Sequence, residues 1–230
     1  VAVEVPDIAS AYRSRMKVAD LSSKKEIAIF ENAKNDLEEA GLTLKNSMDI
    51  LEVSMEIPSL DDTMPDNERL VRAIKKVTGA SKVRLPFQVL TKIARVFRES
   101  NFEVRCVIRT SDEGDIFVYD VYPKSEDIVI GGLAIDIGTT TVSALLINML
   151  TGEIIGKASA GNGQIRYGAD VINRIIESMK PGGSEKLQKA VIDETINPLI
   201  QQMCRANGFK PEHIYRMSIA ANTTMNHLMA

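Results

Sequence analysis

The amino-acid sequence predicts a mixed fold, in which a small α+β middle domain is followed by the start of a larger α/β domain. Two kinds of hydrophobic pattern support this prediction. Apolar residues alternate in some segments, as in half-buried strands, and recur at helical spacing in others. Prolines and glycines stand where such segments would begin and end. A polar stretch at 123–126 separates two groups of segments, so we expect a domain boundary there.

The composition is that of an ordinary globular protein. Of 230 residues, 44% are hydrophobic and 26% are charged, and the net charge of −3 gives no reason to expect nucleic acid or an anionic membrane as a partner. No apolar run reaches the ~18–20 residues that a membrane span requires. Cys106 and Cys204 stand far apart and outside any CxxC pattern. They cannot build a zinc or iron–sulfur site by themselves, and they favour reduced thiols in a cytoplasmic protein.

Residues 1–47 are expected to form a linker arm with one amphipathic helix. The segment 22–40 carries apolar residues at helical spacing, a serine can cap its start, and Gly41 can end it. This helix packs on a neighbouring domain or, alternatively, binds a specific partner. The sequence begins with Val1 and stops inside an expected helix, so we expect both ends to be cut.

Residues 48–125 are expected to form the α+β domain. A strand begins near Met48, and two helices follow, the first between Pro65 and Gly79 and the second after Pro86. The second helix presents one apolar face, made of Leu90, Ile93, Ala94 and Phe97. Two strands then flank a turn at 112–114. The acids at 61–62 are expected to cap and favour the helix start rather than to bind a metal.

Residues 128–230 are expected to begin a second domain. Three antiparallel strands cover 128–160, with a turn at Thr151–Gly152. A helix follows near 168–179, and then a long helix over 184–208 that Pro198 should kink or break. A fourth strand near 213–221 leads into a last helix. This order is the opening of a ribonuclease-H-like fold.

The first hairpin of this domain carries the clearest chemical signal. A buried strand delivers the carboxylate of Asp136 to its end, and Gly138 follows, where the backbone must approach something closely or take an unusual φ. The next three residues are Thr139, Thr140 and Thr141, whose amides and hydroxyls can bind phosphate oxygens. A nearby carboxylate can hold hydrated Mg²⁺. The pattern therefore predicts a site for a triphosphate and its metal, the alternative being a plain Gly–Thr hairpin.

Two further segments combine polar residues with expected helix starts. Asp170 begins the helix after 168, where it favours the positive helix end or lies near nucleotide. Asn222, Thr223 and Thr224 stand at a strand-to-helix turn, which suits capping and anion binding alike. The histidines, His213 and His227, have no acid or cysteine partner in sequence, so we expect no catalytic role for them.

The segment 133–155 resembles the first phosphate motif of the superfamily of acetate and sugar kinases, Hsp70 and actin. The segments 164–174 and 219–225 are similar to motifs of ATP-dependent reductive activators of corrinoid proteins. The segment 58–74 resembles the domain that these activators carry between an N-terminal [2Fe–2S] ferredoxin and the ATPase, and 1–9 resembles the stretch after that ferredoxin. The resemblance covers nearly the whole chain.

The resemblance implies an activator that uses ATP and Mg²⁺ to reduce a Co(II) corrinoid to Co(I) on a corrinoid iron–sulfur protein. It implies Asp136 as the catalytic and metal-side residue, with the hairpin, Asp170 and 222–224 on the nucleotide. Electrons would come from an upstream ferredoxin domain, whose cysteines this sequence lacks. The resemblance is also compatible with a homodimer. Ala220 and Ala221 stand where the family pattern leads us to expect a glycine. We expect this fragment to be inactive alone.

Two other functions fit parts of the sequence. A small-molecule kinase acting on a sugar or carboxylate would share the motif at 136–141 but would not need the unit at 48–125. A binding fragment would use that unit to dock a partner protein.

Overall fold

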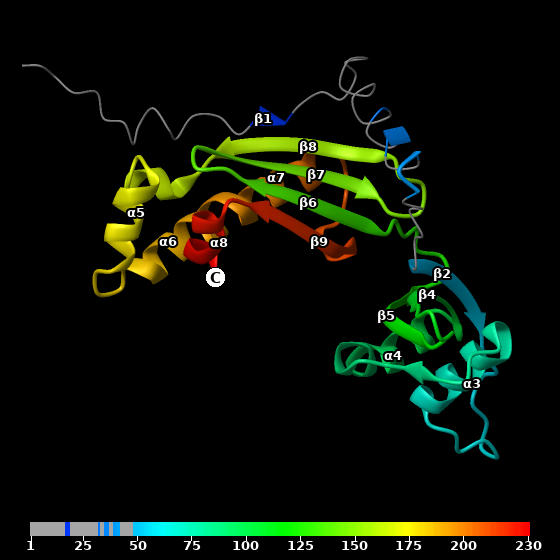
Figure 1. Cartoon of the computed structure of the whole chain (residues 1–230). Coiled ribbons are helices and arrows are strands. Elements are labelled where there is room, and N and C mark those ends of the chain that lie inside the picture. Colours follow the sequence, from blue (N-terminus) through cyan, green and yellow to red (C-terminus); the bar gives the residue numbers. More distant parts are fainter. Residues whose placement is uncertain (1–16, 19–31, 33–34, 37–38, 42–47) are drawn as a thin grey trace, which may run out of the picture. The chain divides into compact units, whose positions relative to one another are not determined.

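The computed structural model describes residues 17–18, 32, 35–36, 39–41 and 48–230, which divide into two compact units (Figure 1). The smaller unit comprises the described part of 43–130 with 149–151, and the larger unit comprises the described part of 1–42 with 131–148 and 152–230. The helix expected at 22–40 and the strand expected at 1–9 lie largely or wholly outside the described residues. None of the helices in the described ranges is long and apolar enough to cross a membrane.

The described part of the smaller unit contains a four-stranded sheet with strand order β2-β4-β5-β3. Strands β2 (Met48–Ser54), β4 (Glu103–Thr110) and β5 (Ile116–Pro123) are antiparallel, and the short β3 (Val83–Arg84) runs parallel to β5 at the edge. Helices α3 (Asp66–Thr78) and α4 (Phe87–Glu99) pack on the sheet around a core that includes Leu70, Phe97, Cys106 and Val118.

The helix ends of the smaller unit follow from local chemistry. Pro65 and Pro86 stand at the N-caps of α3 and α4, where a missing N–H leaves no helical hydrogen bond unmade. Gly79 ends α3 in the left-handed conformation, with φ +72°. The expected buried face of α4 is only half right, because Val89 and Val96 are buried with Ile93 and Phe97, whereas Leu90 and Ala94 are exposed. Both faces are apolar enough in sequence, and the sheet decides which one packs.

The described part of the larger unit contains a five-stranded sheet with strand order β1-β8-β7-β6-β9. The three expected strands β6 (Gly131–Ile137), β7 (Thr141–Asn148) and β8 (Ile154–Gly161) are antiparallel. Strand β9 (Ile214–Ala221) runs parallel to β6, and β1 (Lys17–Val18) pairs with β8. Sequence reasoning identified β9 but neither β1 nor β3, since two-residue strands leave no periodic pattern.

Helices cover the sheet of the larger unit (Figure 1). The described helices are α5 (Val171–Ser178), α6 (Gly183–Val191), α7 (Asn197–Ala206) and α8 (Thr223–Met229), with short 3₁₀ turns at Gly163–Arg166 and Pro211–His213. Leu187 of α6 and Met203 of α7 pack in one core with Ile135 and Leu146 of the sheet.

The long helix expected over 184–208 is interrupted before Pro198 rather than kinked within a continuous helix. A π-helical turn at Ile192–Ile196 separates α6 from α7, and the Asn197 N–H donates to the Ile192 carbonyl. Pro198 occupies the second position of α7, where it has no N–H to donate. The wider turn therefore takes up the irregularity that the proline imposes.

Candidate functional site

The expected phosphate hairpin lies where the parallel strands β6 and β9 end. Asp136 stands opposite Ala220 and Ile137 opposite Ala221, so the turn after β6 and the turn after β9 leave the same edge of the sheet. The Asn222 side-chain amide nitrogen lies 3.4 Å from the Thr139 hydroxyl oxygen. Pairing of the two strands thus joins segments that are more than eighty residues apart.

Asp136 points to the exposed face of the sheet near the end of β6. Its neighbours across the strands are Ser143 and Ala220, and its carboxylate makes no hydrogen bond or ion pair with the residues that the structure describes. A hydrated divalent cation is held through one or two carboxylates, with waters and phosphate oxygens completing its shell. An accessible carboxylate without a protein partner suits that chemistry.

Gly138 is required by a close contact and not by its backbone dihedrals, since it is absent from the positive-φ residues. Its N–H donates to the Thr141 carbonyl over 2.9 Å, which closes the hairpin turn. A Cβ added at this glycine would stand 2.7 Å from the same carbonyl oxygen. Any other residue would therefore open the turn that carries Thr139 and Thr140.

A buried arginine holds this turn from behind. Arg174 of α5 is 0% exposed, and one of its guanidinium nitrogens donates to the Thr139 carbonyl over 2.6 Å. Its Nε donates to the Gly168 carbonyl over 2.9 Å, and its third nitrogen lies 3.3 Å from the Met225 sulfur. Burial lowers the pKa of Arg174, and the nearby Asp170 carboxylate opposes that shift. The planar fork thus fixes the hairpin, the start of α5 and α8 relative to one another.

Two buried amides complete the support. Asn162, 1% exposed, donates to the Gly138 carbonyl over 2.9 Å, and its backbone N–H donates to the Thr140 carbonyl over 2.8 Å. Gln164, also 1% exposed, donates to the Leu187 carbonyl over 3.1 Å. Three successive carbonyls of the turn, at 138, 139 and 140, are therefore bound by side chains or backbone from 162–174. Such buried polar networks make a loop rigid when their members are paired.

The remaining predicted site residues lie at helix starts. Asp170 caps α5, with one carboxylate oxygen accepting from the Asn173 N–H over 2.8 Å and the other from its side chain over 2.9 Å. Asn222 caps α8 by accepting from the Met225 N–H over 2.9 Å. Thr223 and Thr224 are the first two residues of α8. The structure brings Asn222 to the hairpin, whereas the hydrogen bonds of Asp170 go to Asn173 within its own helix.

Sequence reasoning missed Asn162 and the support that Arg174 provides. Arg174 ends the segment 164–174 and Asn162 lies just before it, yet the segment carries no spacing that marks a buried arginine. The only available signal was its resemblance to a family motif.

Neither the acids of the smaller unit nor the cysteines form a metal site within the described ranges. No group of three His, Cys, Asp or Glu side chains is found there that could hold a metal ion. Asp62 instead accepts from the Met64 N–H and pairs with Arg69 at 2.6 Å, which lowers the pKa of Asp62. Cys106 and Cys204 are free and buried, in separate units.

Comparison with known proteins gives matches over most of the chain. Residues 37–127 match a family model described as the RACo linker region, and residues 131–230 match one described as the RACo middle region. A corrinoid activation enzyme, RamQ of Eubacterium limosum, is 31% identical over 144 residues, which are 62% of this chain and 23% of that protein. A solved reductive activator for corrinoid, iron-sulfur protein is 33% identical with a TM-score of 0.64, over 81% of this chain and 29% of its own. The chain thus spans less than a third of either relative's length.

Proposed function

The chain belongs to the RACo family, whose linker and middle regions account for residues 37–127 and 131–230, and on that premise we propose that it is part of an ATP-dependent reductive activator of a corrinoid protein. The whole protein would bind ATP and Mg²⁺ at the β6–β7 hairpin, dock a corrinoid iron–sulfur protein and reduce its Co(II) to Co(I). The larger unit, in this proposal, supplies one wall of the nucleotide site.

The observation that carries this proposal is the hydrogen-bonded turn at 138–141 beside Asp136, whose carboxylate has no partner among the described residues. Phosphoryl-transfer chemistry depends mainly on positioning and on electrostatic stabilisation. The turn at 138–141 is held on its inner side by three hydrogen-bonded carbonyls, which leaves the threonine hydroxyls for an outer ligand. Asp136 stands exposed beside it. These residues fit a nucleoside triphosphate with a hydrated Mg²⁺, and the metal would neutralise charge on the phosphates.

Each residue has a separate task in the proposed site. Asp136 holds the hydrated metal, and Thr139, Thr140 and Thr141 bind phosphate oxygens. Asn222, with Thr223 and Thr224 behind it, borders the turn from the end of β9. Asp170 caps α5, the helix that carries Arg174. Arg174 touches no ligand in this proposal and acts by holding the turn in place.

The [2Fe–2S] cluster of the proposed activator does not fit the cysteines of this chain. Cys106 and Cys204 are both buried and lie in separate units, whereas such a cluster takes four close ligands. The electrons would therefore come from another part of the protein or from another protein.

The test compares two carboxylates in the whole protein. Asp136→Asn should lower Mg²⁺-dependent ATP hydrolysis about 10²–10³-fold, a loss of ~2.7–4 kcal/mol that is typical of removing one electrostatic contact to the transition state. Asp193→Asn changes an exposed carboxylate of the same unit and should leave the rate unchanged. The same preparations are mixed with a Co(II) corrinoid protein and a chemical reductant, and Co(I) is followed by its absorption.

Three outcomes would count against the proposal. Hydrolysis by Asp136→Asn at the parental rate would remove Asp136 from the metal side. Formation of Co(I) that does not depend on ATP would show that ATP hydrolysis is not coupled to reduction of the corrinoid. Transfer of the γ-phosphate to a sugar or carboxylate instead of water would favour the small-molecule kinase.

A further inference from the structure

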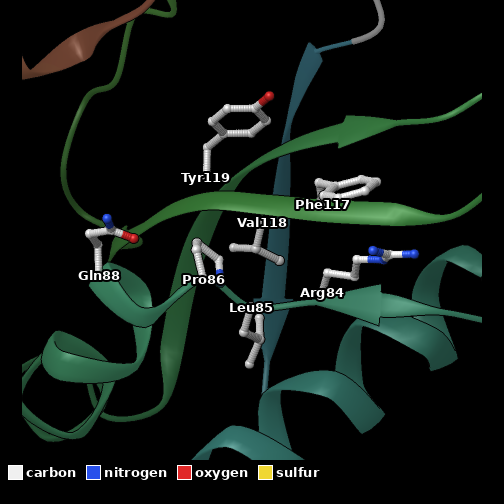
Figure 2. Close-up of a pocket in the computed structure, with 7 residues that line it drawn as sticks. All are labelled: Arg84, Leu85, Pro86, Gln88, Phe117, Val118 and Tyr119. Carbon is white, nitrogen blue, oxygen red and sulfur yellow. The ribbon is translucent and has the colours of Figure 1, made fainter.

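A groove of about 570 Å³ lies on the smaller unit, beside the edge strand β3 (Figure 2). It is lined by Arg84, Leu85, Pro86, Gln88, Phe117, Val118 and Tyr119. The groove exists because β3 ends at Arg84 and the chain turns at Pro86 into α4, whereas the neighbouring β5 continues to Pro123. This surface belongs to a different unit from the hairpin site.

Two arginines flank one aromatic ring beside this groove. Strand pairing places Arg109 of β4 and Arg84 of β3 on either side of Phe117 of β5, in one row across the sheet. Each guanidinium carbon lies 5.1 Å from the centroid of the Phe117 ring. The row faces away from the helix-covered core, since the neighbouring residues Ile116 and Val118 belong to that core. Figure 2 shows Arg84 extending toward the Phe117 ring.

Neither arginine has an acidic partner among the residues that the structure describes. Arg84 makes no hydrogen bond or ion pair there, and the Nε of Arg109 is buried without an acceptor. Asp115, the residue just before β5, forms an ion pair with Lys82 over 3.9 Å. Two positive charges thus lie beside one aromatic ring, and the buried Nε–H of Arg109 has no acceptor. Both features raise the free energy of the folded chain unless an anion binds beside them.

The walls of the groove are apolar. Leu85 and Pro86 form part of its lining, and Tyr119 and the adjacent Phe87 are 38% and 77% exposed. A simple anion would bind the arginines and make no contact with these apolar walls. A peptide with a carboxylate next to an apolar side chain would use both. Because β3 is an edge strand, an extended segment can also lie along the sheet.

We propose that this groove binds an extended acidic segment of a partner protein, with carboxylates held by Arg84 in the groove and by Arg109 across the Phe117 ring, and with an adjacent apolar side chain placed in the groove. Arginine suits this task, since its planar fork binds a carboxylate through two parallel hydrogen bonds while it stacks on an aromatic ring. The proposal does not rest on the nucleotide site and stands whether or not the hairpin binds ATP.

The test uses the 230-residue chain and a library of random seven-residue peptides displayed on phage. Enriched sequences should carry Asp or Glu beside an apolar residue. The best peptide is then synthesised with a fluorescent label, and its binding is measured by anisotropy. Arg84→Gln and Arg109→Gln should each weaken binding about tenfold or more, as expected for loss of a charge-assisted hydrogen bond. Arg95→Gln is the matched control, because it removes an exposed arginine on the helix α4.

Circular dichroism checks that each variant is folded, and Arg84, which is exposed, remains informative if Arg109→Gln is not. The proposal is overturned if no peptide is enriched, if the enriched peptides lack acidic residues, or if their Asn or Gln forms bind equally well. It is also overturned if Arg95→Gln weakens binding as much as Arg84→Gln. Full competition by acetate at millimolar concentration would identify an anion site only, without peptide recognition.

Discussion

The support of the phosphate hairpin by Arg174 can be tested by Arg174→Met, a substitution that keeps much of the side-chain volume and removes the guanidinium. The change leaves the Thr139 carbonyl, bound over 2.6 Å, and the Gly168 carbonyl, bound over 2.9 Å, without their donor. A hydrogen bond from a charged group contributes about 1.5–3 kcal/mol. Relief of the buried charge offsets part of the loss in global stability. The local free energy that keeps the turn closed has no such compensation.

Hydrogen exchange measured by mass spectrometry reports on that local free energy. The Gly138 N–H, bound to the Thr141 carbonyl, and the Asn162 N–H, bound to the Thr140 carbonyl, close and anchor the turn. Loss of about 1.5–3 kcal/mol should accelerate exchange of these amides about tenfold to a hundredfold. Arg174→Lys keeps the charge but cannot reach two carbonyls with one fork, so it should give an intermediate rate.

The matched control is Arg166→Met, which removes an exposed arginine of the same unit that pairs with Glu194. An exposed ion pair contributes only about 0–1 kcal/mol, so exchange at the hairpin should stay near the parental rate. Equal hairpin exchange in Arg174→Met and the parental chain would refute the reasoning. A uniform acceleration that extends equally to α7 would show a general role in stability and no specific support of the turn.

Three further predictions follow from single contacts. Gly138→Ala should lower the free energy of unfolding by about 1–3 kcal/mol, because its Cβ would stand 2.7 Å from the Thr141 carbonyl; an unchanged melting temperature would contradict this. Arg69 lowers the pKa of Asp62 from its ordinary 3.8, so the pair stabilises the fold above about pH 4 and is lost as the pH falls through the lower folded pKa; Asp62→Asn should flatten the acid limb of a stability–pH profile, and an identical limb would count against the pair. Burial, with a smaller contribution from a nearby carboxylate, raises the pKa of Cys106 to about 12, so a thiol reagent at pH 8 should modify it only after denaturation, and stability should fall above pH 9, the ordinary value, where only the unfolded thiol ionises; rapid modification of the folded chain would disprove this.

Much of the local structure could be predicted from particular residues. Alternating apolar residues predicted β6, β7 and β8, and the structure has them as antiparallel neighbours. Pro65 and Gly79 predicted the limits of α3, because a missing N–H and a left-handed backbone act on their own segment whatever packs around it. The hairpin turn after Asp136 was predicted from the glycine and the three threonines that stand between two apolar segments.

Other features could not be predicted, because they depend on which segments meet. The sequence of α4 offers apolar residues on more than one face, and the wrong pair, Leu90 and Ala94, was expected to be buried. The edge strand β3 has only two residues, and β5 defines it by pairing with it. Arg174 reads as an ordinary polar residue of an amphipathic helix, yet it is fully buried.

Residue patterns alone predicted the local elements, the acid–glycine–threonine turn and the resemblance to the family whose models match the chain. These depend on steric and hydrogen-bonding preferences within a few residues. Three contacts are visible only in the folded chain: Asn222 lies beside Thr139, Arg174 and Asn162 bind the turn, and Arg84 and Arg109 flank one aromatic ring. Burial of a polar group and pairing of distant strands are set by what the rest of the chain brings to the same place, and short-range patterns carry no record of that.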